Sequence, residues 1–215
     1  MRGHTASWRS TGSIILPPWW RRRAGGLLAL LAVAVVAVCD RSLQGPTHGG
    51  DETRYHDRSF QVTYVVDGDT LDINAPDADQ PTTRVRLWGV DTPEIGHGRE
   101  PDMHFGPEAK AFAEQTLAGR DVHLVLSPKR TRDKYGRLLA YVFLERGGTM
   151  FNEMLLEQGY AYADLRFDHH YDARFEGIEK RARKAGVGLW ANVRVGDMPE
   201  WRQKRESPKE PMNEP

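Results

Sequence analysis

The chain has a single cysteine, Cys39, among its 215 residues. An intramolecular disulfide is therefore excluded, and so are CxxC redox chemistry and a cysteine zinc cluster. An excess of either charge is also lacking, since 30 Lys and Arg balance 30 Asp and Glu. This balance excludes a polybasic protein that binds nucleic acid by bulk charge, so a nucleic-acid partner would have to be held by a local cluster of charges.

Long apolar runs are scarce as well. The clearest run covers residues 24–38 (AGGLLALLAVAVVAV) and follows three consecutive arginines at 21–23. A positive segment before a short apolar one is typical of an export signal, and the run is shorter than the roughly 20 residues of a membrane span. We therefore expect an extracytoplasmic protein, either secreted or tethered to the membrane through residues 24–39. Cys39 leaves lipidation open as a third alternative, although a lipoprotein signal prefers a small residue where Val38 stands.

The composition divides the chain into four segments. Residues 1–39 are predicted to be a signal peptide or membrane anchor, and residues 40–58 a polar linker. Residues 59–194 form a candidate domain with a net charge of −3, large enough to bury a core. Residues 195–215 combine prolines with mixed charges, which predicts a disordered tail.

Alternating apolar and polar residues in the candidate domain predict five short strands. They cover residues 60–66, 71–73, 83–88, 121–127 and 138–144. In the third strand Val85 and Leu87 should face the core, while Arg84 and Arg86 should face away from it.

Three helices are predicted between and after these strands. The first begins at Gly106-Pro107, the second is capped by Thr149 and ends at Gly159, and the third is capped by Asp172 and ends at Gly186. Five strands with a helix between the third and fourth suggest an α+β protein with a mainly β core: a five-stranded OB-fold barrel with three packed helices.

Polar residues concentrate in three segments where the predicted strands end. Residues 67–70 (DGDT) are typical of a tight hairpin turn, in which Gly68 permits a left-handed conformation. Residues 86–94 (RLWGVDTPE) place an arginine and two carboxylates close together, and residues 129–137 (KRTRDKYGR) are typical of a solvated basic loop. Each segment alone has an ordinary structural explanation, but the three together indicate chemistry.

The combined segments contain the parts for attack on a phosphodiester. Asp69 and Asp91 offer hard oxygen ligands, which suit calcium or magnesium rather than zinc. Arg86 and Arg137 are planar, permanently charged groups that can hold phosphate oxygens. Glu94, three residues after Asp91, can orient or deprotonate a water beside the metal.

Six blocks of sequence, in order over about residues 60–191, resemble the thermonuclease, or staphylococcal nuclease-like, family. They are VVDGDTL, RLWGVDTPE, FGPEAKAF, DKYGRLLAYVF, NEMLLEQGYA and GLW. The resemblance implies a five-stranded OB barrel with three helices and one bound Ca²⁺. It also implies cleavage of DNA and RNA to products that end in a 3′-phosphate.

The same resemblance assigns roles at the metal. Asp69 and Asp91 match the family's calcium carboxylates, and Thr92 matches the residue that adds its backbone carbonyl. Glu94 matches the general base or water-orienting group, and Asp67 matches a carboxylate near the metal that does not bind it directly.

Further roles follow for the substrate. Arg86 and Arg137 match the two phosphate-binding arginines of the family, and Lys134 and Tyr135 match residues that line the substrate nucleotide.

One departure from the family pattern concerns two tyrosines that pack against the nucleotide in its best-known member. Leu165 and Phe167 stand at the aligned positions. Phe167 can still stack on a base, but neither residue supplies a hydroxyl. Arg166, Tyr160 and Tyr162 are candidates to compensate, although packing is the more ordinary explanation for each tyrosine.

Histidines outside these segments give no comparable signal. His169 and His170 are adjacent, which is typical of two solvated side chains in an exposed loop rather than of a metal site. His97 and His104 lie between Glu94 and the first predicted helix, and nothing in the pattern gives them a role.

The leading hypothesis is an exported, calcium-dependent, sugar-nonspecific endonuclease that acts on single-stranded or locally opened DNA and RNA. We expect a monomer, since the three helices leave no apolar face uncovered. The main alternative is a non-catalytic OB-fold module that binds nucleic acid or protein, and a third is a structural lipoprotein of the cell envelope. A degenerate module should lack part of the polar set, whereas this chain retains Asp69, Arg86, Asp91, Glu94 and Arg137.

Overall fold

The computed structural model describes residues 48–96 and 98–207. The signal or anchor expected in residues 1–39, with Cys39, lies outside the described residues. Within the described part, no helix combines the length and the apolar character that crossing a membrane requires.

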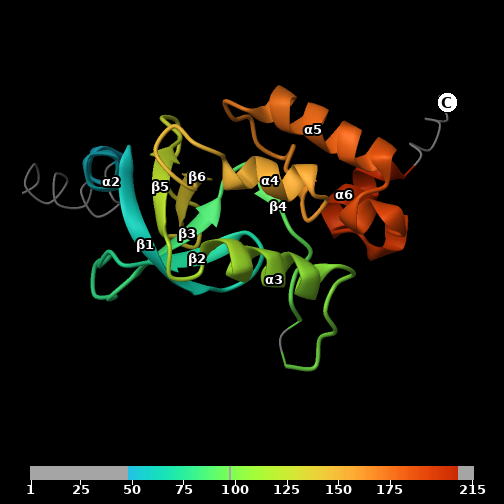
Figure 1. The fold of residues 1–215 in the computed structure, drawn as a ribbon, viewed down its shortest axis with the longest axis horizontal. Coiled ribbons are helices and arrows are strands. Elements are labelled where there is room, and N and C mark those ends of the chain that lie inside the picture. The colour runs from blue at the N-terminus through green and yellow to red at the C-terminus, as the bar shows by residue number, and fades with distance from the viewer. Residues whose placement is uncertain (1–47, 97, 208–215) are drawn as a thin grey trace, which may run out of the picture. The chain divides into compact units, whose positions relative to one another are not determined.

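Five strands close into a barrel in the order β1-β2-β3-β6-β5 (Figure 1). The strands are β1 (Arg58–Val65), β2 (Thr70–Ile73), β3 (Thr83–Leu87), β5 (Asp121–Leu126) and β6 (Leu138–Phe143). Four of the neighbouring pairs are antiparallel, and β3 runs parallel to β6. The α+β barrel of the OB type predicted from the sequence is confirmed, and each predicted strand lies within two residues of an observed one.

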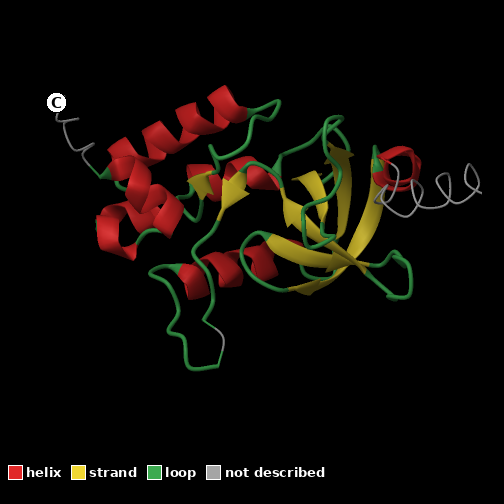
Figure 2. Ribbon diagram, turned by 180° about the vertical axis from the view of Figure 1, so that it is seen from behind, coloured by secondary structure: helices red, strands yellow, loops and turns green. Residues whose placement is uncertain are grey.

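Three helices follow the predicted pattern. They are α3 (Gly106–Leu117), α4 (Phe151–Glu157) and α5 (Asp172–Ala185). Helix α4 contacts both β6 and α5, so it lies between the barrel and the last long helix (Figure 2). The predicted caps are wrong by one residue, because the N-caps of α4 and α5 are Met150 and Tyr171 rather than Thr149 and Asp172. The carboxylate of Asp172 instead accepts the N–H of Ala173 in the first turn.

Two short strands outside the barrel were not predicted. β4 (Val90–Asp91) pairs antiparallel with β7 (Tyr162–Ala163), with Asp91 opposite Tyr162. Two residues are too few to produce a recognisable alternation in the sequence. This small ladder fixes the backbone of Asp91 beside the segment that enters α5.

The segment predicted as a linker contains helix α2 (His48–Tyr55), so that prediction is wrong for residues 48–55. Tyr55 is fully buried, and its hydroxyl lies 2.9 Å from the Thr83 hydroxyl. The buried carboxylate of Asp51 pairs with Arg132 at 2.7 Å. One aromatic anchor and one ion pair hold a helix whose average composition is polar.

The segment predicted as a disordered tail also has structure, so that prediction is wrong for residues 195–206. After the 3₁₀ turn η1 (Gly188–Ala191), a second turn η2 (Val195–Asp197) leads into α6 (Glu200–Glu206). Met198 is buried in a small second core with Leu189 and Trp190. Residues 208–215 lie outside the described part.

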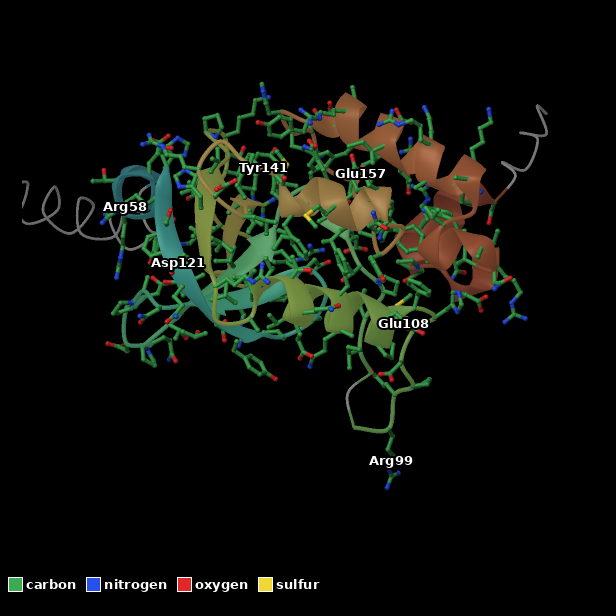
Figure 3. All side chains as sticks on the ribbon, viewed as in Figure 1. Arg58, Arg99, Glu108, Asp121, Tyr141 and Glu157 are labelled. Atoms are coloured by element: carbon green, nitrogen blue, oxygen red, sulfur yellow. The ribbon has the colours of Figure 1, made fainter. Side chains whose placement is uncertain are left out.

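The segment between β4 and α3 contains His97 and His104. Arg99 lies at its tip and points away from the barrel (Figure 3). Residue 97 is outside the described part, and His104 is exposed beside the ring of Phe105. The exposed position of His104 gives it no contact with the site residues.

Candidate active site

The turn between β2 and its preceding strand places the first carboxylate. The side chain of Asp67 accepts the N–H of Asp69 at 3.0 Å, and the N–H of Val66 donates to the Thr70 carbonyl at 2.9 Å. Gly68 is not in the left-handed conformation that we expected. Glycine is required here for another reason, since a Cβ at this position would lie 2.8 Å from the methyl group of Thr92.

Asp69 is buried, with 3% of its surface exposed. Its Oδ2 accepts the N–H of Thr92 at 2.7 Å and lies 2.9 Å from Nη1 of Arg86, while Oδ1 accepts the hydroxyl of Thr70 at 3.1 Å. Burial raises the pKa of Asp69 to about 7, and the nearby charge of Asp67 adds to the rise, although Arg86 opposes it. The buried environment therefore disfavours the charged form of Asp69, and Arg86 offsets only part of this effect.

Asp91 is the second buried carboxylate and is 7% exposed. Its Oδ1 lies 2.6 Å from Nη2 of Arg86 and 3.1 Å from Nη2 of Arg166, and its Oδ2 accepts the indole N–H of Trp201 at 2.7 Å. Burial raises the pKa of Asp91, and the charge of Asp69 raises it further. Both carboxylates thus experience the same crowding.

Arg86 bridges the two carboxylates. The register of β2 and β3 brings it beside Asp69, because Thr70 lies opposite Arg86. The guanidinium also donates through Nη1 to the carbonyls of Leu87 (3.0 Å) and Val90 (2.7 Å). Although burial lowers the pKa of Arg86, the charges of Asp69 and Asp91 outweigh it and raise the pKa.

Arg84 and Arg86 alternate with the buried Val85 and Leu87 and so face away from the core, as expected, and Arg84 is exposed and pairs with Asp72. Arg86 points out of the barrel but is 9% exposed. The residues of β4 and the carboxylates cover it, so the arginine becomes part of a buried charge cluster.

Glu94 follows β4 and is exposed. Desolvation of the carboxyl group by neighbouring residues raises the pKa of Glu94, and the charges of Asp69 and Asp91 raise it further. The charges of Arg86 and Arg137 lower it. A carboxylate that is accessible to solvent and has a raised pKa is suited to accept and return a proton.

The oxygen atoms around Arg86 are the candidate ligands for a metal ion. Among residues 48–96 and 98–207, no three His, Cys, Asp or Glu side chains converge as a metal cage. Asp69 and Asp91 with the Thr92 carbonyl form a smaller set of hard oxygens, which suits a divalent cation that keeps several waters. The two buried carboxylates share the guanidinium of Arg86 at 2.9 and 2.6 Å, and burial raises the pKa of each, an effect that a bound cation would oppose, so the residues fit a cation.

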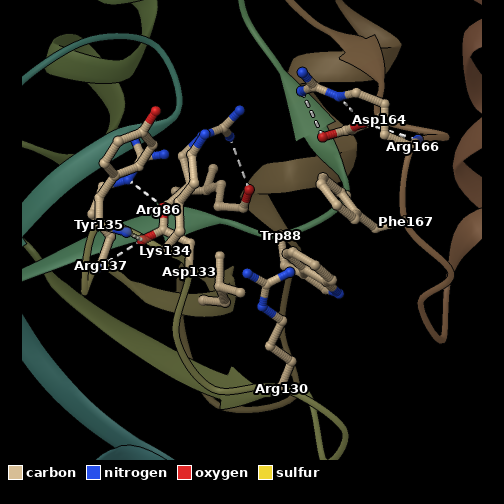
Figure 4. A pocket seen from close by; sticks show the side chains of 13 residues that line it. Arg86, Trp88, Arg130, Asp133, Lys134, Tyr135, Arg137, Asp164, Arg166 and Phe167 are labelled. Atoms are coloured by element: carbon tan, nitrogen blue, oxygen red, sulfur yellow. Dashed lines mark hydrogen bonds and ion pairs between the residues drawn. The ribbon is translucent and has the colours of Figure 1, made fainter. Parts of the chain in front are cut away.

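A hollow of about 360 Å³ lies beside this cluster (Figure 4). Five of the predicted site residues line it: Arg86, Lys134, Tyr135, Arg137 and Phe167. Asp133 holds the Nε of Arg137 at 2.7 Å, and the guanidinium of Arg137 lies 5.5 Å from the centre of the Tyr135 ring. The structure therefore brings the basic loop and the carboxylate cluster to one place.

The opposite wall of the hollow is aromatic. Phe167 stacks on Trp88, with ring centres 5.6 Å apart and planes 24° apart. The guanidinium groups of Arg130 and Arg166 lie 5.8 and 5.9 Å from the Phe167 ring centre. Leu165 packs against the core instead, so of the two departures from the family pattern Phe167 is the one that lines the hollow.

Of the three residues considered as compensation, Arg166 lines the hollow and the two tyrosines do not. Tyr160 stacks on Phe112 at 4.4 Å, and Tyr162 is fully buried. Packing therefore accounts for both tyrosines.

One histidine prediction is wrong. His169 is buried, with 8% of its surface exposed, and its Nδ1 lies 3.3 Å from the Tyr141 hydroxyl. The turn into α5 folds the ring under Gly89, where an added Cβ would lie 2.5 Å from it. His170 is exposed, as expected.

Several residues of the site were not predicted. Trp88 and Arg130 line the hollow and lie inside the polar segments 86–94 and 129–137. Their position in these segments is the sequence signal that could have identified them. Trp201 lies in a segment whose composition indicated disorder, and no local pattern connects it with Asp91, 110 residues earlier.

The chain is similar to known nucleases. Residues 84–192 match the model of the family described as staphylococcal nuclease homologue. The thermonuclease of Staphylococcus hyicus is 33% identical over 167 residues, which cover 77% of this chain and 95% of the relative. The thermonuclease of Staphylococcus intermedius is 35% identical over 75% of this chain and 94% of the relative, and the micrococcal nuclease of Shigella flexneri is 28% identical over 82% and 94%. By its matched domain and by these relatives, the chain belongs to the staphylococcal nuclease homologue family.

Proposed function

We propose that this nuclease-type hydrolase is a calcium-dependent endonuclease that cleaves DNA and RNA and leaves 3′-phosphate ends. The observation that carries the proposal is a buried cluster of Asp69, Asp91 and Arg86 that adjoins a hollow lined by Arg137 and Lys134. A crowded pair of carboxylates next to cationic groups is suited to a metal and a phosphate together.

Asp69, Asp91 and the Thr92 carbonyl would hold the calcium ion. When bound, the ion supplies positive charge to a phosphate oxygen and makes a neighbouring water more acidic. The N–H of Thr92 donates to the carboxylate of Asp69, so the backbone of Thr92 and the side chain of Asp69 are held next to each other.

Glu94 accepts a proton from the attacking water in this scheme. The water oxygen bonds to phosphorus, the bond from phosphorus to the 5′ oxygen breaks, and the leaving 5′ oxygen takes up a proton. The phosphate stays on the 3′ side. The raised pKa of Glu94 brings its proton affinity closer to neutral pH, which favours transfer in both directions.

Arg86 and Arg137 neutralise the charge that accumulates on the phosphate oxygens. Arg86 is held by two carboxylates and two carbonyls, and Arg137 by Asp133, so little reorganisation is needed during the reaction. Preorganised charges of this kind each contribute about 10²–10³-fold to the rate.

Tyr135, Lys134 and Phe167 bind the nucleotides that flank the phosphate. Exposed aromatic rings beside cations suit unpaired bases, which can stack without sequence readout. We therefore propose single-stranded or locally opened substrates, with DNA and RNA both accepted.

Location and assembly are proposed on the sequence alone. The charged and apolar segment before residue 39 supports export, with secretion or membrane tethering as the two forms. A monomer is the proposed state.

The test is cleavage of single-stranded DNA by the full chain in calcium, read on a denaturing gel, with a chelator as one control. Glu94→Gln should slow cleavage about 10²-fold or more, whereas Glu100→Gln, which changes an exposed glutamate in the same loop, should not. If the new 3′ ends carry phosphate, a DNA polymerase should extend the fragments only after phosphatase treatment, which identifies the end chemistry. Intact DNA that is nevertheless retarded on a native gel would contradict the nuclease and support a binding module.

A further inference from the structure

Helix α6 reaches the proposed metal site from outside the matched family domain, which ends at residue 192. The indole N–H of Trp201 donates to Oδ2 of Asp91 at 2.7 Å. A neutral donor that bonds directly to a candidate metal ligand is in the position from which such ligands are commonly oriented.

The helix is anchored by ion pairs to α5. Arg202 is 5% exposed, and its Nη1 lies 3.2 Å from Oε2 of Glu179, which is 3% exposed. Glu206 receives both Arg202 at 3.0 Å and Arg183 at 2.8 Å. These contacts fix the helix rigidly enough for Trp201 to hold a defined direction toward Asp91.

The hydrogen bonds of Asp91 show which of its oxygens can bind a cation. A carboxylate has about four lone-pair positions, two on each oxygen. Oδ1 accepts a hydrogen bond from Arg86 and forms an ion pair with Arg166 at 3.1 Å, and Oδ2 accepts a hydrogen bond from Trp201. Among the described residues the indole is the one hydrogen-bond donor to Oδ2, so this oxygen keeps a lone pair for a cation and Trp201 fixes its direction.

Trp201 also supports Arg166. The guanidinium lies 4.7 Å from the centre of the Trp201 ring, while Asp164 accepts its Nε at 2.7 Å. Arg166 lines the hollow. The same indole therefore contacts a proposed metal ligand through its edge and a cation of the hollow through its face.

We propose that Trp201 is a positioning residue for the Asp91 carboxylate and that α6 thereby sets the calcium affinity of the site. The proposal rests on the proposed function, because it takes calcium as the ion held by Asp69 and Asp91. Trp201 acts through Asp91 and does not touch the reacting phosphate.

The test measures calcium binding to the full chain by calorimetry, for the wild type and for Trp201→Phe. Phenylalanine keeps a ring against Arg166 and removes the N–H, so the fold should survive, and urea unfolding checks this. We expect the calcium Kd to rise about 10-fold, as for other partners of metal ligands. At saturating calcium the variant should cleave DNA within about twofold of the wild-type rate.

Trp190→Phe is the matched control. The Trp190 ring also lies 5.9 Å from the Arg202 guanidinium, but its buried indole N–H has no hydrogen-bond partner among the described residues. Its calcium Kd should stay within about twofold of the wild type, which separates loss of the N–H to Asp91 from loss of a tryptophan near α6.

Three results would overturn the proposal. An unchanged or tighter Kd in Trp201→Phe removes the positioning role while leaving the nuclease intact, provided that the wild type binds calcium and cleaves DNA. A rate that remains about 10-fold low at saturating calcium assigns Trp201 to something other than metal affinity. A wild type that binds no calcium overturns this proposal together with the proposed cofactor.

Discussion

The two sides of the candidate site differ in their exposure to water. Asp69, Arg86 and Asp91 are 3%, 9% and 7% exposed, whereas Tyr135 and Phe167 on the rim of the hollow are 72% and 45% exposed. Charges act more strongly where water is excluded, while a nucleotide must enter and leave through an open surface. The comparison indicates that chemistry depends on the buried cluster and substrate affinity on the rim.

The difference also extends to how each residue is supported. In the buried cluster the partner of each charged group is another member, so removing one leaves an uncompensated charge. On the rim, Tyr135 and Phe167 contact cations and rings that water can solvate if the contact is lost. Substitutions in the cluster should therefore change both folding stability and rate, and substitutions on the rim should change only binding.

The largest effect is expected for Arg86→Ala. The change leaves Asp69 and Asp91 buried without their shared cation, so unfolding free energy should fall by about 3–5 kcal/mol and kcat by about 10³-fold. Urea unfolding and single-turnover cleavage measure the two losses. Arg84→Ala is the control, because Arg84 is an exposed neighbour on the same strand. Equal stability in the two variants would contradict the buried-cluster account.

Glu94→Gln should have the next largest effect, on rate alone. The amide cannot accept the proton of the water, so kcat should fall about 10²-fold or more while KM and the calcium Kd change little. Steady-state kinetics and calorimetry separate these quantities. A loss shared equally between kcat and calcium affinity would assign Glu94 to the metal rather than to the water.

A smaller effect is expected on the rim, for Phe167→Ala. Stacking on one base contributes about 1–3 kcal/mol, so KM should rise about 10-fold with kcat within twofold. The measurement is cleavage of short single-stranded oligonucleotides, with Phe167→Tyr as the conservative control that keeps the ring on Trp88. A fall in kcat instead of a rise in KM would mean that the rim takes part in chemistry.

The smallest effect is a pH dependence of stability outside the site. Burial lowers the pKa of His169 below its ordinary 6.5, even though Asp172 and Asp164 oppose this. The folded protein favours the neutral imidazole of His169, so the unfolded chain takes up a proton at higher pH than the folded protein does. The contribution of His169 to the free energy of unfolding is therefore fully present above pH 6.5 and is lost as the pH falls below it. Urea unfolding at pH 7.5 and 5.5 should therefore show a smaller decline for His169→Gln than for the wild type. Identical declines would contradict the lowered pKa.

The sequence predicted the barrel for local reasons, and several of the polar residues that it singled out lie together in the structure. Alternation in strands such as Phe60–Val66 depends on one buried face, and Asp69, Asp91 and Glu94 lie next to strand ends that the pattern identifies. Register then brought Asp69 beside Arg86.

What could not be predicted depends on contacts between distant segments. Trp201 joins Asp91 across 110 residues, and Tyr55 joins Thr83 from a segment with the composition of a linker. The burial of Arg86 has the same origin, because β4 and two carboxylates cover a side chain that alternation alone turns away from the core. A domain cut at residue 194, as the sequence suggested, would remove the Trp201 contact with the site.

The most direct test of the central claim, that the buried carboxylates form a calcium site, is the melting temperature of the full chain as calcium is titrated. At about 100 times Kd, binding adds about 2.7 kcal/mol, which should raise Tm by roughly 5–10 °C in the wild type. Asp72→Asn, changed on the strand that follows Asp69 but paired with exposed Arg84, should keep this rise, and Asp69→Asn should lose it. A wild-type Tm that does not change with calcium would contradict the account. So would an Asp69→Asn variant whose Tm rises with calcium as much as that of the wild type.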